Sequence, residues 1–307
     1  MSLTRRFHEN ELARLLEERG VLVADGGIGT ILLSLGLDAG TPPELWNAGR
    51  PDEITAVHQA YVEAGADILL TNTFGANRLR LAHRGLATRT EELNSAAAVI
   101  ARTVTNAAER PIIVAGSIGP TGSLFAPLGS LEADEAVSVF THQMTALANS
   151  KVDVLWIETM SSIDELSAAH AAASEFDLPV VSTMSFDTNG HTMMGTSPTD
   201  LAAWWDAQDP RPAAVGANCG IGPDETVAAV AQITGATNDA VVVAKGNCGL
   251  PVWEGADIRY PIGPDGMVDY TERNLEAGAR IIGACCGSTP EHISVIRKTV
   301  DRIRAET

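Results

Sequence analysis

The feature that most constrains the fold is a regular alternation of short apolar runs with amphipathic helical patterns along the whole chain. The runs are rich in β-branched residues and apolar on both faces, which is typical of parallel strands covered on both sides. Eight runs are predicted as strands: VLVADGG (21–27), DILLTNTF (67–74), PIIVAGSIG (111–119), VDVLWIETM (152–160), PVVSTMSF (179–186), AAVGANCG (213–220), AVVVAKGN (240–247) and RIIGACCG (280–287). Helices are predicted between them, for example at 52–66, 131–149 and 268–279.

Eight strand–helix units in 307 residues indicate a closed (β/α)8 TIM barrel, an α/β fold for which about 250 residues is typical. We expect a single domain over residues 1–307, because no linker or low-complexity tract divides the chain. The charged, amphipathic segment 1–20 predicts an N-terminal helix rather than an export signal. A doubly wound open sheet is the alternative. The glycines of DGGIGT (25–30) do not fit GxGxxG, so they do not favour a dinucleotide-binding form of that sheet.

The composition excludes several classes of partner. The chain carries 21 Lys and Arg against 39 Asp and Glu, a formal charge of −18, whereas nucleic acids and anionic membrane surfaces attract basic proteins. No apolar run reaches the roughly 18 residues that a membrane span requires. Four cysteines, two of them adjacent, do not make a disulfide scaffold. We therefore expect a cytoplasmic protein with free thiols that binds neither nucleic acid nor membranes.

Polar side chains gather where the predicted strands end. In a barrel the active site is built at the carboxyl ends of the strands. Seven of the eight strands end in a polar or unusual cluster: Asp25-Gly26-Gly27, Thr71-Asn72-Thr73, Ser117, Glu158-Thr159, Asn218-Cys219-Gly220, Lys245-Gly246-Asn247-Cys248 and Cys285-Cys286-Gly287. One convergent site is therefore predicted at the barrel mouth.

Three cysteines are candidate metal ligands. Cys219 ends the sixth predicted strand, and Cys285 and Cys286 end the eighth, so three thiolates can meet above the barrel. Three thiolates and one open position describe a catalytic zinc site, and sulfur ligands favour zinc over magnesium or calcium. Adjacent strand residues point to opposite faces, so the backbone must leave strand geometry at 285–286, which Gly283 and Gly287 make feasible. The alternatives are three small buried residues or a vicinal disulfide, which leaves Cys219 without a role.

Six segments together resemble the homocysteine S-methyltransferase family: DGGIGT (25–30), TNTFGAN (71–77), WIETM (156–160), GANCG (216–220), GLP (249–251) and GACCGSTPEHI (283–293). They follow the family's order, and GxNC followed by GxCCG is the specific part. The family includes betaine–homocysteine methyltransferase, S-methylmethionine-dependent enzymes and the homocysteine module of cobalamin-dependent methionine synthase. The resemblance implies a (β/α)8 barrel that binds zinc through Cys219, Cys285 and Cys286. It leaves a homo-oligomer possible, since the family commonly self-associates.

The resemblance also implies a reaction, the synthesis of methionine from homocysteine. Only a thiolate is a competent nucleophile, and zinc coordination deprotonates a thiol, so the bound homocysteine sulfur can attack an electrophilic methyl group in line. By the same resemblance, Asp25 and Glu158 bind the ammonium group of homocysteine. Gly26 and Gly27 bring backbone N–H groups to its carboxylate, and Thr73 shapes the pocket.

The methyl donor is less constrained. Quaternary ammonium donors are usually held in aromatic boxes, and two box positions of the vertebrate betaine enzymes correspond to Gly75 and Thr159 here. Trp46, in TPPELWN, is a candidate wall of the donor pocket, with a packing role as the alternative. The sequence stops at residue 307, so we expect a small diffusible donor or a separate corrinoid protein rather than a cobalamin domain of this chain. Glycine betaine or a related onium compound ranks first, S-methylmethionine second and a methylated corrinoid partner third.

Three further interpretations stay open. Lys245 ends the seventh predicted strand, where a lysine can form a Schiff base as in a barrel lyase; a salt bridge to Asp25 or Glu158 is the ordinary alternative. Cys248 stands where the family usually has a small residue without sulfur, so it is either a resting-state zinc ligand or a small buried residue. A sulfur-binding module that serves a corrinoid partner is the non-catalytic alternative.

Overall fold

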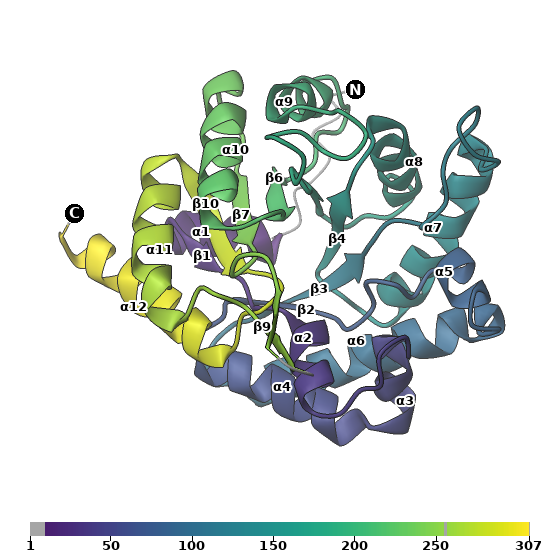
Figure 1. Ribbon diagram of the computed structural model, residues 1–307, viewed down its shortest axis with the longest axis horizontal. Coiled ribbons are helices and arrows are strands. Elements are labelled where there is room, and N and C mark those ends of the chain that lie inside the picture. The colour runs from purple at the N-terminus through teal and green to yellow at the C-terminus, as the bar shows by residue number, and fades with distance from the viewer. Residues whose placement is uncertain (1–9, 255–256, 307) are drawn as a thin grey trace, which may run out of the picture.

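The computed structural model describes residues 10–254 and 257–306. Its centre is an eight-stranded parallel barrel with helices around the outside (Figure 1). The barrel strands are β1 (Leu22–Val23), β2 (Ile68–Leu70), β3 (Ile113–Ile118), β4 (Val154–Met160), β5 (Val180–Met184), β6 (Ala214–Cys219), β7 (Val242–Gly246) and β10 (Ala279–Ala284). Each overlaps one of the eight predicted strand segments, so the predicted barrel is confirmed.

The strand order distinguishes a barrel from an open sheet. Neighbouring strands run β1-β10-β7-β6-β5-β4-β3-β2. The two ends of this order meet, because a parallel bridge joins Ala24 to Ile68 and the N–H of Asp67 donates to the carbonyl of Val23 at 2.6 Å. A doubly wound sheet has two free edges, so that alternative is excluded.

The helices follow the strands in the expected alternation. They are α1 (Glu11–Arg19), α2 (Ile28–Ser34), α3 (Trp46–Gly49), α4 (Pro51–Glu63), α5 (Arg78–Ala82), α6 (Thr90–Ala107), α7 (Ala133–Asn149), α8 (Ile163–Ala173), α9 (Pro198–Asp206), α10 (Pro223–Ala236), α11 (Met267–Glu276) and α12 (Pro290–Glu306). Short 3₁₀ turns are η1 (Pro43–Leu45), η2 (Ala87–Arg89) and η3 (Pro264–Gly266). The predicted helices at 52–66, 131–149 and 268–279 correspond to α4, α7 and α11. No helix within the described ranges is both long and apolar enough to span a membrane.

The predicted N-terminal helix is α1, although residues 1–9 of the predicted segment lie outside the described residues. The side chain of Asn10 caps it by accepting from the N–H of Leu12 at 3.0 Å. Leu12 and two further leucines of α1 join one apolar cluster with the first inward-facing residues of the strands, among them Ile68 and Val154. Helix α1 therefore closes the amino-terminal end of the barrel.

Side chains alternate between the two faces of each strand, as the two-residue period requires. On β4, Val154 and Trp156 belong to the inner cluster, whereas Leu155 belongs to the outer cluster under the helices. The next inward position is Glu158, and the same count places Ser117 on β3 and Lys245 on β7 inside the barrel. A polar layer thus lies directly above the apolar interior.

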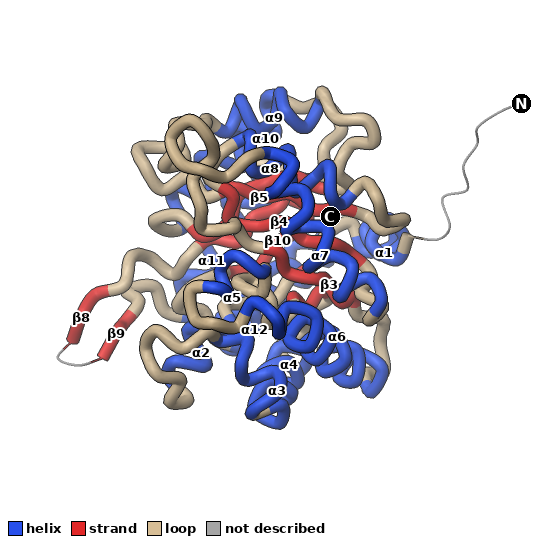
Figure 2. The backbone as a smooth tube through the Cα atoms, turned by 90° about the vertical axis from the view of Figure 1, so that its right-hand side faces the viewer, coloured by secondary structure: helices blue, strands red, loops and turns tan. Residues whose placement is uncertain are grey.

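One element was not predicted. A hairpin of β8 (Val252–Glu254) and β9 (Asp257–Arg259) follows β7 and projects from the barrel (Figure 2). Three-residue strands are too short to show a period of two in the sequence.

Buried His58 generates a prediction about pH and stability. This residue of α4 is fully buried, neither ring nitrogen has a hydrogen-bond partner among the described residues, and burial lowers its pKa to about 4 from 6.5. As the pH falls below 6.5, the imidazole of His58 therefore takes up a proton in the unfolded chain but stays neutral in the folded chain. The contribution of neutral His58 to the free energy of unfolding is complete above pH 6.5 and declines as the pH falls toward 4. Between pH 7.5 and 5 we expect a loss of about 2 kcal/mol in the free energy of unfolding from this group.

The variant His58→Leu removes that loss, and urea denaturation at both pH values measures it. The exposed His142 of α7 offers the control His142→Leu, which we expect to retain the wild-type pH dependence. An unchanged difference between pH 7.5 and pH 5 in His58→Leu would contradict the prediction.

Candidate active site

Three thiols meet at the carboxyl ends of β6 and β10. The Sγ atoms of Cys219, Cys285 and Cys286 all lie within 4.8 Å of one another, and those of Cys219 and Cys285 are 3.1 Å apart. All three cysteines are free thiols. Three sulfurs bound to one tetrahedral zinc ion lie about 3.8 Å apart, so a small widening of the shortest contact suffices for a common metal.

The backbone leaves strand geometry at both thiol positions. Strand β10 ends at Ala284, so Cys285 and Cys286 lie in the turn beyond it, where Gly287 has φ 83°. Cys219 itself has φ 58°, a left-handed conformation that costs a residue with a Cβ about 1–2 kcal/mol. Such strain persists where the surroundings over-determine it, commonly at functional sites.

Hydrogen bonds of Asn247 hold the backbone at both thiol positions. Its backbone N–H donates to the carbonyl of Cys219 at 3.0 Å, and its Nδ2 donates to the carbonyl of Gly220 at 2.7 Å. Its Oδ1 accepts from the N–H of Cys286 at 2.9 Å. One side chain thus joins the two loops that carry the thiols. In the sequence, Asn247 is marked only by its place in the cluster at the end of the seventh predicted strand, which does not indicate this role.

Asn218 joins β6 to the ends of β4 and β5 through side-chain hydrogen bonds. Its Oδ1 accepts from the N–H of Thr159 at 2.8 Å and from the hydroxyl of Thr183 at 2.6 Å, and its Nδ2 donates to the Thr159 hydroxyl at 2.6 Å. Thr159 has φ 60° and follows Glu158. Asn218 therefore fixes the end of β4 and, with it, the backbone at Glu158.

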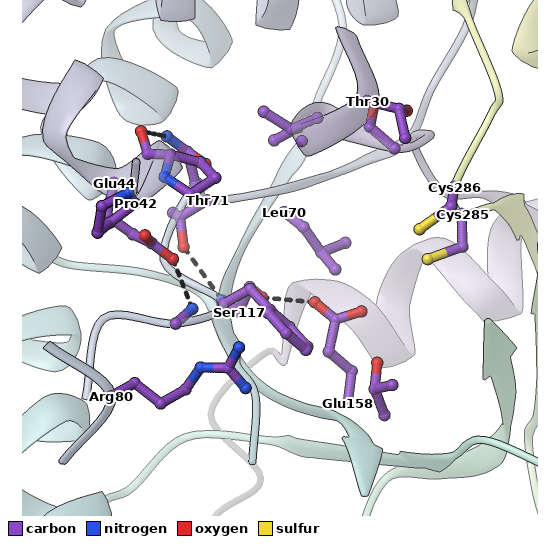
Figure 3. A pocket seen from close by; sticks show the side chains of 18 of the residues that line it. Thr30, Pro42, Glu44, Leu70, Thr71, Arg80, Ser117, Glu158, Cys285 and Cys286 are labelled. Carbon is purple, nitrogen blue, oxygen red and sulfur yellow. Dashed lines mark hydrogen bonds between the residues drawn. The ribbon is translucent and has the colours of Figure 1, made fainter. Parts of the chain in front are cut away.

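Glu158 is a buried carboxylate beside the thiols. It is 7% exposed, lines the cavity and accepts a hydrogen bond from the Ser117 hydroxyl (Figure 3). Burial raises its pKa to about 7 and the charge of Cys285 acts in the same direction, while Lys245 and Ser117 oppose them. A carboxylate in such a place favours a cationic group of a ligand, which would restore its ionised form.

Asp25 and Lys245 form a buried ion pair below the cavity. The Lys245 Nζ donates to Asp25 Oδ1 at 2.8 Å and to the Asp25 carbonyl at 2.9 Å, and Asp25 Oδ2 accepts from the N–H of Leu70 at 2.8 Å. Burial alone would lower the pKa of Lys245, but the charges of Asp25 and Glu158 outweigh it and raise that pKa. Lys245 is therefore held as an ammonium ion, which disfavours Schiff-base chemistry. Asp25 is fully buried and is not among the residues that line the cavity.

Gly26 and Gly27 line the cavity where β1 meets the loop after β10. A Cβ on Gly26 would lie 2.4 Å from the Ser288 Oγ, and one on Gly27 would lie 2.6 Å from the Cys285 carbonyl oxygen, so neither position has room for a side chain. The N–H of Gly27 donates to the Ser288 Oγ at 2.9 Å, which ties this backbone to the thiol-bearing loop.

Two predicted site residues lie outside the cavity. Thr73 is fully buried, and its hydroxyl donates to the Ser117 carbonyl at 2.7 Å. Trp46, at the start of α3, is 7% exposed in the outer core, and the guanidinium of Arg50 lies 3.8 Å from its ring centroid. Trp46 thus has the packing role given above as the alternative.

The cavity at the barrel mouth has a volume of about 610 Å³. Cys285, Cys286 and Glu158 lie toward one end, and Glu44 and Arg80 lie toward the other (Figure 3). Cys219 lines the cavity beside Cys285, and Phe74 lines it beside Arg80. Sites for small ligands measure about 300–1,000 Å³, so this cavity has room for more than one amino-acid-sized molecule. Glu44 on η1 and Arg80 on α5 lie away from the strand ends and had no signal in the sequence, whereas Phe74 was predicted only as the last apolar residue of a strand.

Comparisons with known proteins agree with this geometry. The sequence profile of the family described as homocysteine S-methyltransferase matches residues 22–300. The methionine synthases of Mycobacterium tuberculosis and Mycobacterium leprae are each 30% identical to this chain, over 98% and 96% of its length. The chain spans only 26% and 25% of the length of these two proteins. The metallated form of the Escherichia coli homocysteine methyltransferase MmuM is similar with a TM-score of 0.78 and 26% identity, over 94% of this chain and 99% of that one.

The Asp25–Lys245 pair generates a prediction about stability. Lys245→Met leaves the Asp25 carboxyl buried without its cation, and we expect the free energy of unfolding to fall by about 3–5 kcal/mol. Chemical denaturation measures the change, with Lys298→Met on the exposed face of α12 as the control. The double variant Asp25→Asn/Lys245→Met should recover part of the loss, since no unpaired charge remains. A loss below 1 kcal/mol in Lys245→Met would contradict the pairing.

Proposed function

We propose that this chain, which belongs to the homocysteine S-methyltransferase family, transfers a methyl group to the sulfur of homocysteine and forms methionine. The observation that carries the proposal is the cluster of three thiols at one end of a cavity, with the buried carboxylate of Glu158 beside it. The reducing cytoplasm, which keeps thiols free, is the compartment that suits such a cluster.

We propose zinc as the metal, with Cys219, Cys285 and Cys286 as its ligands. The donor set fits, because three sulfurs within 4.8 Å suit a soft tetrahedral ion and all three cysteines line the cavity, from which a fourth ligand has access. Hydrogen bonds to Cys285 and Cys286, together with burial, raise the pKa of Cys219 well above its usual range, so the three sulfurs do not all ionise without a cation. When bound, zinc would supply the acidity that turns the homocysteine thiol into a thiolate.

The side chains around the cavity orient the substrate. Glu158 binds the ammonium group of homocysteine, and Ser117 holds that carboxylate by its hydrogen bond. Asp25 acts from behind by keeping Lys245 in place. In the transfer, an electron pair on sulfur forms the new S–CH₃ bond, while the C–N or C–S bond of the onium donor breaks and its electrons leave with the amine or thioether.

The donor that we favour is glycine betaine or a related onium compound, followed by S-methylmethionine. The cavity supports a small donor, because it continues well beyond the thiols and Glu158. The mycobacterial relatives named methionine synthase support a second candidate, methyl transfer from a separate corrinoid protein.

The first experiment measures methionine formation by the reduced, zinc-loaded protein, with homocysteine and either glycine betaine or S-methylmethionine. Turnover with either donor establishes the transferase and its donor class. No turnover with either, despite bound zinc and homocysteine, would contradict the small-donor proposal and favour the corrinoid protein or another thiol acceptor.

Glu158→Gln tests the ammonium site. A charge-assisted hydrogen bond contributes about 1.5–3 kcal/mol, so we expect the KM for homocysteine to rise about 10- to 100-fold with little change in the KM for the donor. Glu175→Gln at an exposed position is the control. Equal increases in the KM values for homocysteine and for the donor would contradict an ammonium-binding role for Glu158.

Asn247→Ala and Cys248→Ala, at adjacent positions, test the metal site. Asn247 holds both thiol loops, so its removal should weaken zinc binding about 10- to 100-fold in competition with a chelator. Cys248 is fully buried and lies outside the three-thiol cluster, so Cys248→Ala should bind zinc with wild-type affinity. Loss of zinc from Cys248→Ala would instead make it a ligand.

A further inference from the structure

The cavity has a second end that the reaction at the thiols does not use. Glu44 from η1 and Arg80 from α5 face this end together with the ring of Phe74. In Figure 3 the guanidinium of Arg80 and the thiols of Cys285 and Cys286 lie on opposite sides of the view, with Glu158 between them.

Arg80 lacks a closed ion pair. Its Cζ lies 5.4 Å from the Phe74 ring centroid, and no carboxylate in the described parts of the chain forms a salt bridge with it. The charge of Arg80 acts to lower the pKa of Glu44 and of Glu165, but both carboxyl groups accept hydrogen bonds from other residues. Glu44 accepts from the N–H of Gly75 at 2.6 Å, and Glu165 accepts from the N–H and the hydroxyl of Thr121 at 2.7 and 2.6 Å. The guanidinium therefore keeps donors available to a ligand.

Gly75 keeps the space between Glu44 and Arg80 open. A Cβ on Gly75 would lie 2.8 Å from Glu44 Oε1 and 3.3 Å from Arg80 Nε, so any side chain there would enter the gap between the acid and the guanidinium. An aromatic ring at this position would fill the second end. Its absence leaves a charged pocket in place of an aromatic wall.

The charges around the pocket select the kind of anion. A planar guanidinium matches a carboxylate with two parallel N–H bonds. With two buried acids nearby, one guanidinium supplies too little positive charge for a phosphate, so a monoanion fits better.

We propose that Arg80 binds the carboxylate of the methyl donor, so that the donor is a carboxylate-bearing onium compound. The inference rests on the proposed methyl transfer and deepens it. A donor anchored by its carboxylate at Arg80 presents its onium methyl group toward the thiols at the other end of the cavity, and this orientation replaces the aromatic box. Glycine betaine and S-methylmethionine share this chemistry.

The test compares Arg80→Met with Arg78→Met in the zinc-loaded protein. Arg78 lies on the same helix, makes a long contact of 3.9 Å with Glu135 and does not line the cavity, so its variant is the control. Rates of methionine formation are measured with glycine betaine, S-methylmethionine and trimethylsulfonium, an onium compound without a carboxylate.

Arg80→Met should raise the KM for the carboxylate-bearing donor that the protein uses about 10- to 100-fold. The KM values for homocysteine and trimethylsulfonium should stay within about twofold of wild type. The donor with the larger increase identifies the source of the carboxylate. An equal increase with trimethylsulfonium, or none with any donor, would overturn the inference.

Two measurements keep the inference testable on its own. Calorimetric binding of glycine betaine and S-methylmethionine separates it from the proposed function: no turnover, but binding that Arg80→Met abolishes, would overturn the methyl transfer and support the Arg80 site. Absence of both binding and turnover would overturn both the methyl transfer and the Arg80 site.

Gly75→Ala narrows the pocket while Arg80 is intact. This variant should reproduce the selective rise in the KM for the donor, and a wild-type KM for the donor would count against the Arg80 site.

Discussion

The closed ring of parallel strands is the constraint on which the rest of the structure depends. Because side chains alternate in and out of a closed barrel, the inward residues of each strand form layers. The lower layers are apolar and are closed by α1. Two residues beyond Trp156, the same alternation places Glu158 inside the barrel with Ser117 and Lys245. These buried polar groups need partners, which are other side chains of the layer or a ligand.

The thiol cluster adds a local cost that its surroundings offset. Cys219 adopts a left-handed backbone, and three sulfurs approach within 4.8 Å. Neither is favourable for an isolated loop, because the first strains the backbone and the second brings together groups that repel when ionised. The hydrogen bonds of Asn247 to both loops hold the arrangement, so the fold itself organises the three thiols.

The sequence predicted the elements that depend on local pattern and missed those that depend on distant contacts. All eight barrel strands were found, because buried parallel strands are continuous apolar runs, and the meeting of the three cysteines followed from their places at strand ends. Asp25 was expected to face a substrate, but its partner Lys245 is 220 residues away, and the pairing turns it out of the cavity. Trp46 and Arg80 lie in helices of only 4 and 5 residues, too short for a periodic pattern that would show which of the two faces the cavity.

In the proposed methyl transfer, the distribution of charge along the cavity orients the donor. At one end, three cysteine thiolates around a divalent metal would leave an excess of negative charge, which would attract an onium methyl group. At the other end Arg80 attracts a carboxylate but is flanked by acids that limit its field. A donor that is cationic at one end and anionic at the other is therefore aligned before the bond is made. Methyl transfer converts the onium nitrogen or sulfur into a neutral amine or thioether, so the attraction of that atom toward the thiols ends with the transfer step. The same electrostatic arrangement thus favours both the approach of the donor and the release of its product.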